Sequence, residues 1–117
     1  MGLRPAGSTD LFTVVDPHGY VIRCTPACWR DHVLPDHDSL RDREQDVALA
    51  IKQPEYGMVY RDRQFENRRV YYKRDGGLRF YIKAVVEVDD EGRTGELITA
   101  FHTANKPEGE KLIIWRE

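Results

Sequence analysis

The alternation of hydrophobic and polar residues divides the chain into a short first hairpin, a helical middle and a longer run of strands. Residues 11–15 and 20–24 alternate with a period of two, and Asp16-Pro17-His18-Gly19 between them is typical of a turn. These segments predict a small β-hairpin. Residues 1–10 contain glycine and proline and show no periodicity, so we expect a flexible arm there.

A first helix is expected to begin after Thr25. Threonine is a typical N-cap, and Pro26 suits the first helical position because no amide hydrogen is needed there. The helix should run to about Leu34, since a proline follows. Its spacing predicts that Trp29 and Val33 share the buried side.

A second helix and then a set of strands are expected beyond the first helix. Asp38 or Ser39 is expected to cap the second helix, and the Gln-Pro pair at residues 53–54 should end it. The pattern then changes to period two, which predicts five strands. They cover residues 57–61, 69–74, 79–88, 95–101 and 111–115. Short turns between successive strands indicate an antiparallel meander.

These elements together predict an α+β fold, in which the N-terminal hairpin and two helices pack on a twisted antiparallel sheet of about four strands. A length of 117 residues fits one domain, which we expect over residues 11–117. No run approaches the roughly 18 apolar residues of a membrane helix, and the first residues lack the apolar core of a signal peptide. We therefore expect a cytoplasmic protein without a membrane partner.

Charge is distributed unevenly along the chain. The net charge is −2, which argues against a protein that coats nucleic acid through bulk electrostatics. Basic residues nevertheless crowd residues 61–83, while acidic residues dominate 31–46 and 87–96. Two interpretations stay open for the basic stretch: a local nucleic-acid-binding patch, or a solvated sheet face.

Two cysteines and two histidines at short spacing pose the question of a metal site. Cys24, Cys28, His32 and His37 carry ligand types that zinc prefers. Cys28 and His32 are expected on one continuous helix, however, whereas the ligand pairs of a structural zinc site usually converge across a longer loop. We favour free thiols and expect no metal. A nucleophilic Cys28–His32 pair is disfavoured too, because no third group is evident to orient it.

The two histidines also suit acid–base chemistry. Imidazole titrates near neutral pH, so His32 and His37 could act as base and acid in cleaving an RNA phosphodiester through its 2′-hydroxyl. Cations from the sheet, such as Arg61 and Lys83, would stabilise the charge on phosphorus. From spacing alone, a helix-surface histidine and a loop histidine without such a role are the stronger interpretation.

A late strand adds a hydroxyl group. By strand alternation Thr99 and Phe101 should face one side of the sheet, and Ala100 and His102 the other. Thr99 and His102 should therefore not share a site unless a bulge intervenes. Aromatic residues such as Tyr72 interleave with the basic stretch. This combination is suited to RNA binding, but β-strands are also enriched in aromatic residues in general.

The order of several short motifs resembles a known nuclease family. The motifs are Gly19-Tyr20-Val21, Trp29-x-x-His32, Pro35-x-His37, an acidic helix ending at Pro54, and Thr99-Ala100-Phe101 followed by Lys106-Pro107-Glu108-Gly109. In this order they resemble the phage-associated branch of the barnase, EndoU, colicin and RelE-like nucleases, over roughly Phe12 to Trp115. The resemblance implies a toxin-type domain of two helices and a four-stranded antiparallel sheet that cleaves RNA without metal.

The resemblance also implies roles for individual residues. It marks His32 as the first catalytic residue and Thr99 as a hydroxyl near the scissile phosphate, with Lys83 as a phosphate contact. His37 matches a second histidine, although Asp38-Ser39 follows it here where similar sequences have Pro-Glu.

From these observations we expect a metal-independent endoribonuclease of the toxin type. His32, His37, Thr99 and Lys83 would be catalytic, and the substrate-binding residues would be Arg61, Arg69 and Tyr72. No cofactor is expected. The partners would be an RNA substrate, either tRNA or mRNA on the ribosome, and an antitoxin or immunity protein. The alternative is a non-catalytic module of the same fold that binds RNA or a protein.

Overall fold

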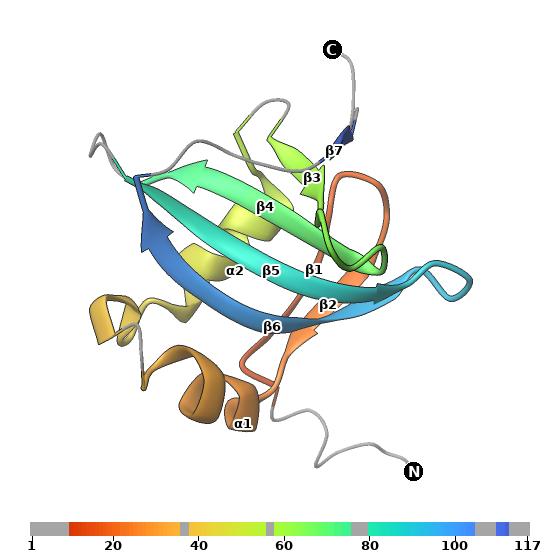
Figure 1. Ribbon diagram of the computed structural model, residues 1–117. Coiled ribbons are helices and arrows are strands. Elements are labelled where there is room, and N and C mark those ends of the chain that lie inside the picture. The colour runs from red at the N-terminus through yellow and green to blue at the C-terminus, as the bar shows by residue number, and fades with distance from the viewer. Residues whose placement is uncertain (1–9, 36–37, 56–57, 76–79, 105–109, 113–117) are drawn as a thin grey trace, which may run out of the picture.

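The computed structural model of the protein describes residues 10–35, 38–55, 58–75, 80–104 and 110–112, which form one mixed sheet with helices on one face (Figure 1). The sheet has seven strands in the order β1-β2-β6-β5-β4-β3-β7. The strands are β1 (Phe12–Val15), β2 (Val21–Cys24), β3 (Val59–Arg61), β4 (Arg68–Arg74), β5 (Tyr81–Asp89), β6 (Thr94–Thr103) and β7 (Glu110–Leu112).

The first helix begins where the sequence predicts. The Thr25 side chain accepts a hydrogen bond of 3.1 Å from the Cys28 amide, so the predicted N-cap is confirmed. The helix starts as α1 (Pro26–Cys28) and continues as the π-helical turn η2 (Trp29–Val33) rather than as a regular α-helix. Trp29 and Val33 are both buried, as expected.

The second helix is shorter than predicted. A 3₁₀ turn, η3 (Asp38–Leu40), is separated from α2 (Glu44–Lys52) by Asp42. The φ angle of Asp42 is 64°, a left-handed conformation that interrupts an α-helix. The expected cap at residue 38 or 39 is therefore wrong, whereas the predicted end at residue 53 is confirmed. No helix among the described residues is long and apolar enough to cross a membrane.

The sheet contains the predicted antiparallel meander of β3, β4, β5 and β6, but it has more strands than four. The N-terminal hairpin joins the same sheet, because β2 pairs in parallel with β6 from Val21↔Thr94 to Arg23↔Glu96. β7 adds a further strand at the other edge, against β3. Residue alternation marks a strand but not its partner, so pairing between segments so distant in sequence was not predictable.

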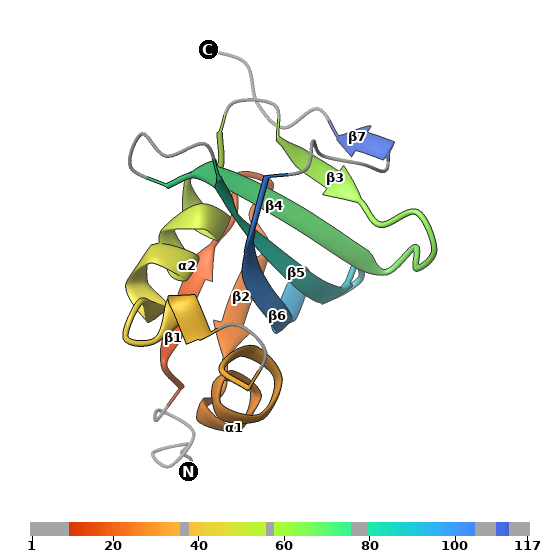
Figure 2. The same ribbon diagram turned by 60° about the vertical axis from the view of Figure 1, so that its left-hand side comes forward.

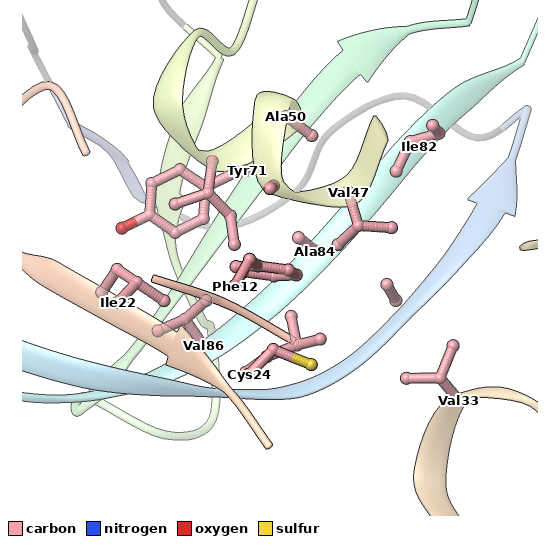
Figure 3. Close-up of a cluster of buried hydrophobic side chains, with 14 of the residues drawn as sticks. Phe12, Ile22, Cys24, Val33, Val47, Ala50, Tyr71, Ile82, Ala84 and Val86 are labelled. Atoms are coloured by element: carbon pink, nitrogen blue, oxygen red, sulfur yellow. The ribbon is translucent and has the colours of Figure 1, made fainter. Parts of the chain in front are cut away.

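The two faces of the sheet have different neighbours. Figure 2 shows α2 lying along one face, with β1 passing close beside it, and α2 contacts β1, β4 and β5. The main core lies under α2. In Figure 3 side chains from the hairpin, α2 and β5, including Ile22, Val47 and Val86, point toward one another. A smaller cluster of Val70, Tyr72 and Val85 lies on the opposite face.

Candidate functional site

The face of the sheet opposite α2, here called the outer face, combines aromatic rings with a lysine. Strand alternation explains it: Tyr71 points into the main core, so its neighbour Tyr72 points outward, and Ile82 and Ala84 leave Lys83 between them on the outer face. The outer face is formed by Met58, Tyr60, Val70, Tyr72, Tyr81, Lys83, Val85, Ile98 and Phe101.

Lys83 lies between two aromatic rings of the outer face. Its Nζ is 5.6 Å from the ring centroid of Tyr72 and 5.3 Å from that of Phe101. The register of the sheet sets this arrangement, because Lys83 on β5 pairs with Tyr72 on β4 and with Phe101 on β6. Both distances lie within the range of cation–π attraction, which holds the ammonium group over the sheet.

Tyr72 is the buried centre of the aromatic group. It is 2% exposed. The rings of Tyr60 and Tyr81 pack edge-on against it, with centroid distances of 5.8 and 6.0 Å. Tyr72 was predicted to bind substrate, but its burial leaves the half-buried rings of Tyr60, Tyr81 and Phe101 better placed to meet a ligand. Tyr72 therefore serves to position its neighbours.

A hollow of about 500 Å³ adjoins Lys83. It is lined by Lys83, Val70 and the loop between β3 and β4, which contributes Asp62, Arg63 and Gln64. The Asp62 carboxylate holds this loop by accepting hydrogen bonds from the amides of residues 64 and 65, at 2.7 and 3.1 Å. Two cationic side chains thus reach the same hollow from different elements.

Arg61, a predicted substrate-binding residue, lies at the base of the same loop. Its Nη1 donates a hydrogen bond of 3.3 Å to the Glu66 carbonyl oxygen. With Arg63 it lines a second hollow next to that of Lys83. On β3, however, Arg61 pairs with Arg69 and therefore occupies a position on the α2 side of the sheet, not beside Lys83.

His32 and Thr99 meet at the edge of β6. A β-bulge interrupts the β5–β6 register between Val85 and Val86, and here the Thr99 hydroxyl donates a hydrogen bond of 3.0 Å to the His32 carbonyl oxygen. His32 is exposed and lines a shallow hollow together with Ile98, a residue of the outer face. Because Val85 pairs with Thr99, the hydroxyl lies two pairs along from the Lys83–Phe101 pair.

Arg69 lies apart from the other predicted residues, on the α2 side of the sheet. Its Nε is 3.5 Å from the Asp16 carboxylate, which also accepts a hydrogen bond of 2.5 Å from the Tyr71 hydroxyl. Burial, followed by the Asp16 charge, raises the pKa of Tyr71 above its ordinary value. Arg69 also contacts His18. The structure thus places Arg69 in a buried polar network and not beside Lys83.

His37 lies outside the described residues. Of the other residues considered for zinc, Cys24 is buried in the core, and the Cys28 thiol donates to the Leu97 carbonyl oxygen at 3.0 Å. A hydrogen bond between the two thiols lowers the pKa of Cys28 and raises that of Cys24. Within the described ranges, no three His, Cys, Asp or Glu residues are grouped so that they could hold a metal ion.

Tyr60 and Phe101 were not predicted to lie in the surroundings of Lys83. The alternation along the strands does carry this information. Tyr60 follows the core residue Val59, and Phe101 follows the core residue Ala100, so both rings should face away from the core. What the sequence lacked was the register that brings three strands together at Lys83.

Comparisons of the chain with protein-family models, with curated proteins and with solved structures find no match.

Proposed function

We propose that the protein is a metal-independent endoribonuclease of the toxin type, which binds RNA on the outer face and cleaves it near the β6 edge. The observation that carries the proposal is the position of Lys83. Its ammonium group lies between aromatic rings, two pairs along the sheet from the place where Thr99 meets His32.

The outer face suits single-stranded RNA. Bases stack on aromatic side chains irrespective of sequence, and cations meet the phosphates between them. Tyr60, Tyr81 and Phe101 provide rings, while Lys83 and Arg63 provide charge at one hollow. Further cation–aromatic pairs, Arg74 over Tyr81 and Arg68 over Phe65, extend the same combination along β4.

The proposed reaction is a transesterification within the RNA. One imidazole removes the 2′-hydroxyl proton, the bond from the 2′-oxygen to phosphorus forms, and the bond from phosphorus to the 5′-oxygen breaks as a second imidazole protonates the leaving oxygen. The products are a 2′,3′-cyclic phosphate and a 5′-hydroxyl. His32 and His37 are assigned to the proton transfers, and Lys83 to the charge that develops on phosphorus.

One contact favours a second candidate function. The Thr99 hydroxyl already donates to the His32 carbonyl oxygen, so Thr99 joins η2 to the sheet and holds the edge together. If Thr99 has only this structural role, the outer face could bind RNA, or an acidic antitoxin or immunity protein, without catalysing cleavage. Binding would then be strongly salt-dependent and no product would form.

The experiment is cleavage of total RNA in the presence of EDTA. Wild type should produce fragments, and His32→Ala should lower the rate roughly 100-fold or more, since acid–base groups contribute about that much. His18→Ala is the matched control, because His18 lies on the α2 side beside Arg69 and should leave the rate unchanged. If wild type binds RNA but neither it nor the variants cleave it, the binding module is the correct function.

A further inference from the structure

A second polar cluster lies on the α2 side of the sheet, near the end of β6. Ser39 comes from η3, Arg43 precedes α2, Asp75 follows β4, and His102 lies on β6. His102 points to this side because it pairs with the core residue Ile82. Four separate elements thus bring a hydroxyl, an imidazole, a carboxylate and a guanidinium together.

The cluster is a continuous chain of hydrogen bonds. The Ser39 Oγ is 2.8 Å from His102 Nδ1, and His102 Nε2 is 2.7 Å from Asp75 Oδ2. Asp75 is an acceptor for His102 Nε2–H, so this contact keeps the imidazole proton on Nε2 and leaves Nδ1 as the acceptor for the serine hydroxyl. The same three groups in the same order activate a nucleophilic serine in other folds, where the two ring nitrogens have exchanged roles.

Arg43 holds the carboxylate in place. Its Nη1 and Nη2 donate to the two Asp75 oxygens at 2.9 and 2.6 Å, and its Nε donates to Asp46 at 2.8 Å. The two hydrogen bonds from Arg43 are the main reason that the pKa of Asp75 lies below its ordinary value. The carboxylate is therefore ionised at neutral pH and can orient the imidazole.

The cluster is accessible from a hollow of about 610 Å³. The hollow is lined by Ser39, Arg43, Asp75, Phe80, His102, Thr103 and Ala104. Ser39 is exposed, whereas the His102 side chain is 19% exposed and the Asp75 side chain 11%. The reactive hydroxyl thus faces solvent while its partners are shielded, which is the arrangement that a nucleophile needs.

We infer that Ser39 is the nucleophile of a second reaction centre, which transfers the acyl group of small uncharged esters. The substrate class follows from the hollow: the charge of Arg43 is neutralised by Asp75 and Asp46, and Phe80, which is 46% exposed, offers an apolar contact to an acyl chain. The Arg43 guanidinium lines the hollow as a candidate donor to the oxyanion.

The reaction proceeds in two steps. The Ser39 Oγ forms a bond to the carbonyl carbon as its proton passes to His102 Nδ1, and the bond to the leaving alkoxide breaks as that proton moves on to the leaving oxygen. Water then attacks the carbonyl carbon of the acyl-serine and loses a proton to His102. The bond from that carbon to the Ser39 Oγ breaks as His102 returns the proton to the serine oxygen, and the carboxylic acid leaves. No oxidant, metal or cofactor enters either step.

The test is covalent labelling of the intact chain by a fluorophosphonate, which bonds to an activated serine oxygen with loss of fluoride. Mass spectrometry should place one label on Ser39 in wild type. Ser39→Ala should remove it, and His102→Gln should slow it roughly 100-fold. His18→Gln controls for loss of an imidazole elsewhere, and Lys83→Met should be labelled like wild type because Lys83 lies on the outer face.

Three results would overturn the inference: no label on wild type, equal label on wild type and Ser39→Ala, or His102→Gln labelled as fast as wild type. The exposed Ser39 hydroxyl makes Ser39→Ala a safe variant for folding. Hydrolysis of p-nitrophenyl acetate, with a burst equal to the labelled fraction, gives a second readout. Neither measurement depends on the cleavage of RNA.

Discussion

At the scale of single residues, Tyr71 shows how the core depends on one buried hydrogen bond. Its hydroxyl donates to Asp16, whose other oxygen accepts from the amides of His18 and Tyr20 at 2.8 and 2.9 Å. One carboxylate therefore joins the turn of the first hairpin to β4. The sequence marks the turn at Asp16 but not its partner across the core.

Tyr71→Phe should lower the free energy of unfolding by about 1–3 kcal/mol, because it leaves a buried carboxylate without one of its donors. Urea denaturation measures the change. Tyr81→Phe is the control: its hydroxyl accepts an exposed hydrogen bond of 3.4 Å from Arg74, so its effect should stay within about 0.5 kcal/mol. Equal effects from the two variants would contradict the role given to Asp16.

Asp75 should make the free energy of unfolding depend on pH in the acid range. Its pKa is lowered in the folded protein, chiefly by Arg43, so folding favours the ionised form. That stabilisation is fully present above the unfolded pKa of about 4 and is lost as the pH falls through the lower folded pKa. The stability difference between wild type and Asp75→Asn should therefore be large at pH 7 and shrink below about pH 4.

This dependence is measured by urea denaturation at pH 7 and at acid pH. Asp42→Asn is a suitable control, since its side chain is exposed and asparagine adopts its left-handed conformation readily. A difference between wild type and Asp75→Asn that stays constant with pH would show that the Arg43–Asp75 pair does not set the pKa.

At the scale of elements, the parallel β2–β6 junction depends on Gly95. A Cβ at this position would lie 2.8 Å from Ile22 Cδ1 and 2.9 Å from the Glu87 carbonyl oxygen. Gly95→Ala should therefore destabilise the protein by about 1–3 kcal/mol through overpacking.

Gly92 offers the matched control, since a Cβ there would lie 3.3 Å from a side-chain oxygen of Asp89 and not against backbone. Thermal unfolding of Gly92→Ala should stay close to wild type. If Gly95→Ala is equally harmless, the hairpin does not pack on β6 as closely as described.

The elements were predictable to different degrees. Thr25-Pro26 indicated a helix start, and the period-two pattern indicated β3 to β6, because these signals are local. The break at Asp42 was not predictable, since nothing in the sequence near it excludes a continuous helix. The bulge beside Thr99 was not predictable either, because an extra residue such as Ile98 leaves no mark in the alternation.

At the scale of the whole molecule, charge and aromatic rings separate into two faces. Of the predicted site residues, Lys83 lies on the outer face with the His32–Thr99 contact beside it, whereas Arg69 and its register partner Arg61 occupy positions on the α2 side. The composition of residues 61–83 indicated a basic surface. Which of its cations share a face depends on strand register, and this is why Arg69 could not be separated from the others by sequence.

RNA binding should depend on cations of the outer face and not on cations of the α2 side. With a single-stranded 2′-O-methyl oligonucleotide, which cannot be cleaved through its 2′-oxygen, the slope of log K against log salt should fall by about 0.7 in Lys83→Met. Lys73→Met is the control, because Lys73 pairs with Ile82 and its Nζ donates to the Gln53 carbonyl oxygen on the other side. Its slope should equal that of wild type in fluorescence anisotropy, and equal losses would contradict binding on the outer face.

The most direct test of the proposed function compares two labelled oligonucleotides in EDTA, one of RNA and one with a 2′-deoxy sugar at each position where the RNA is cut. Transesterification needs the 2′-hydroxyl as nucleophile. We predict that the RNA is cut to fragments ending in 2′,3′-cyclic phosphate and that the 2′-deoxy positions stay intact. Cleavage at those positions, or no cleavage of either strand by protein that binds both, would contradict the proposed function.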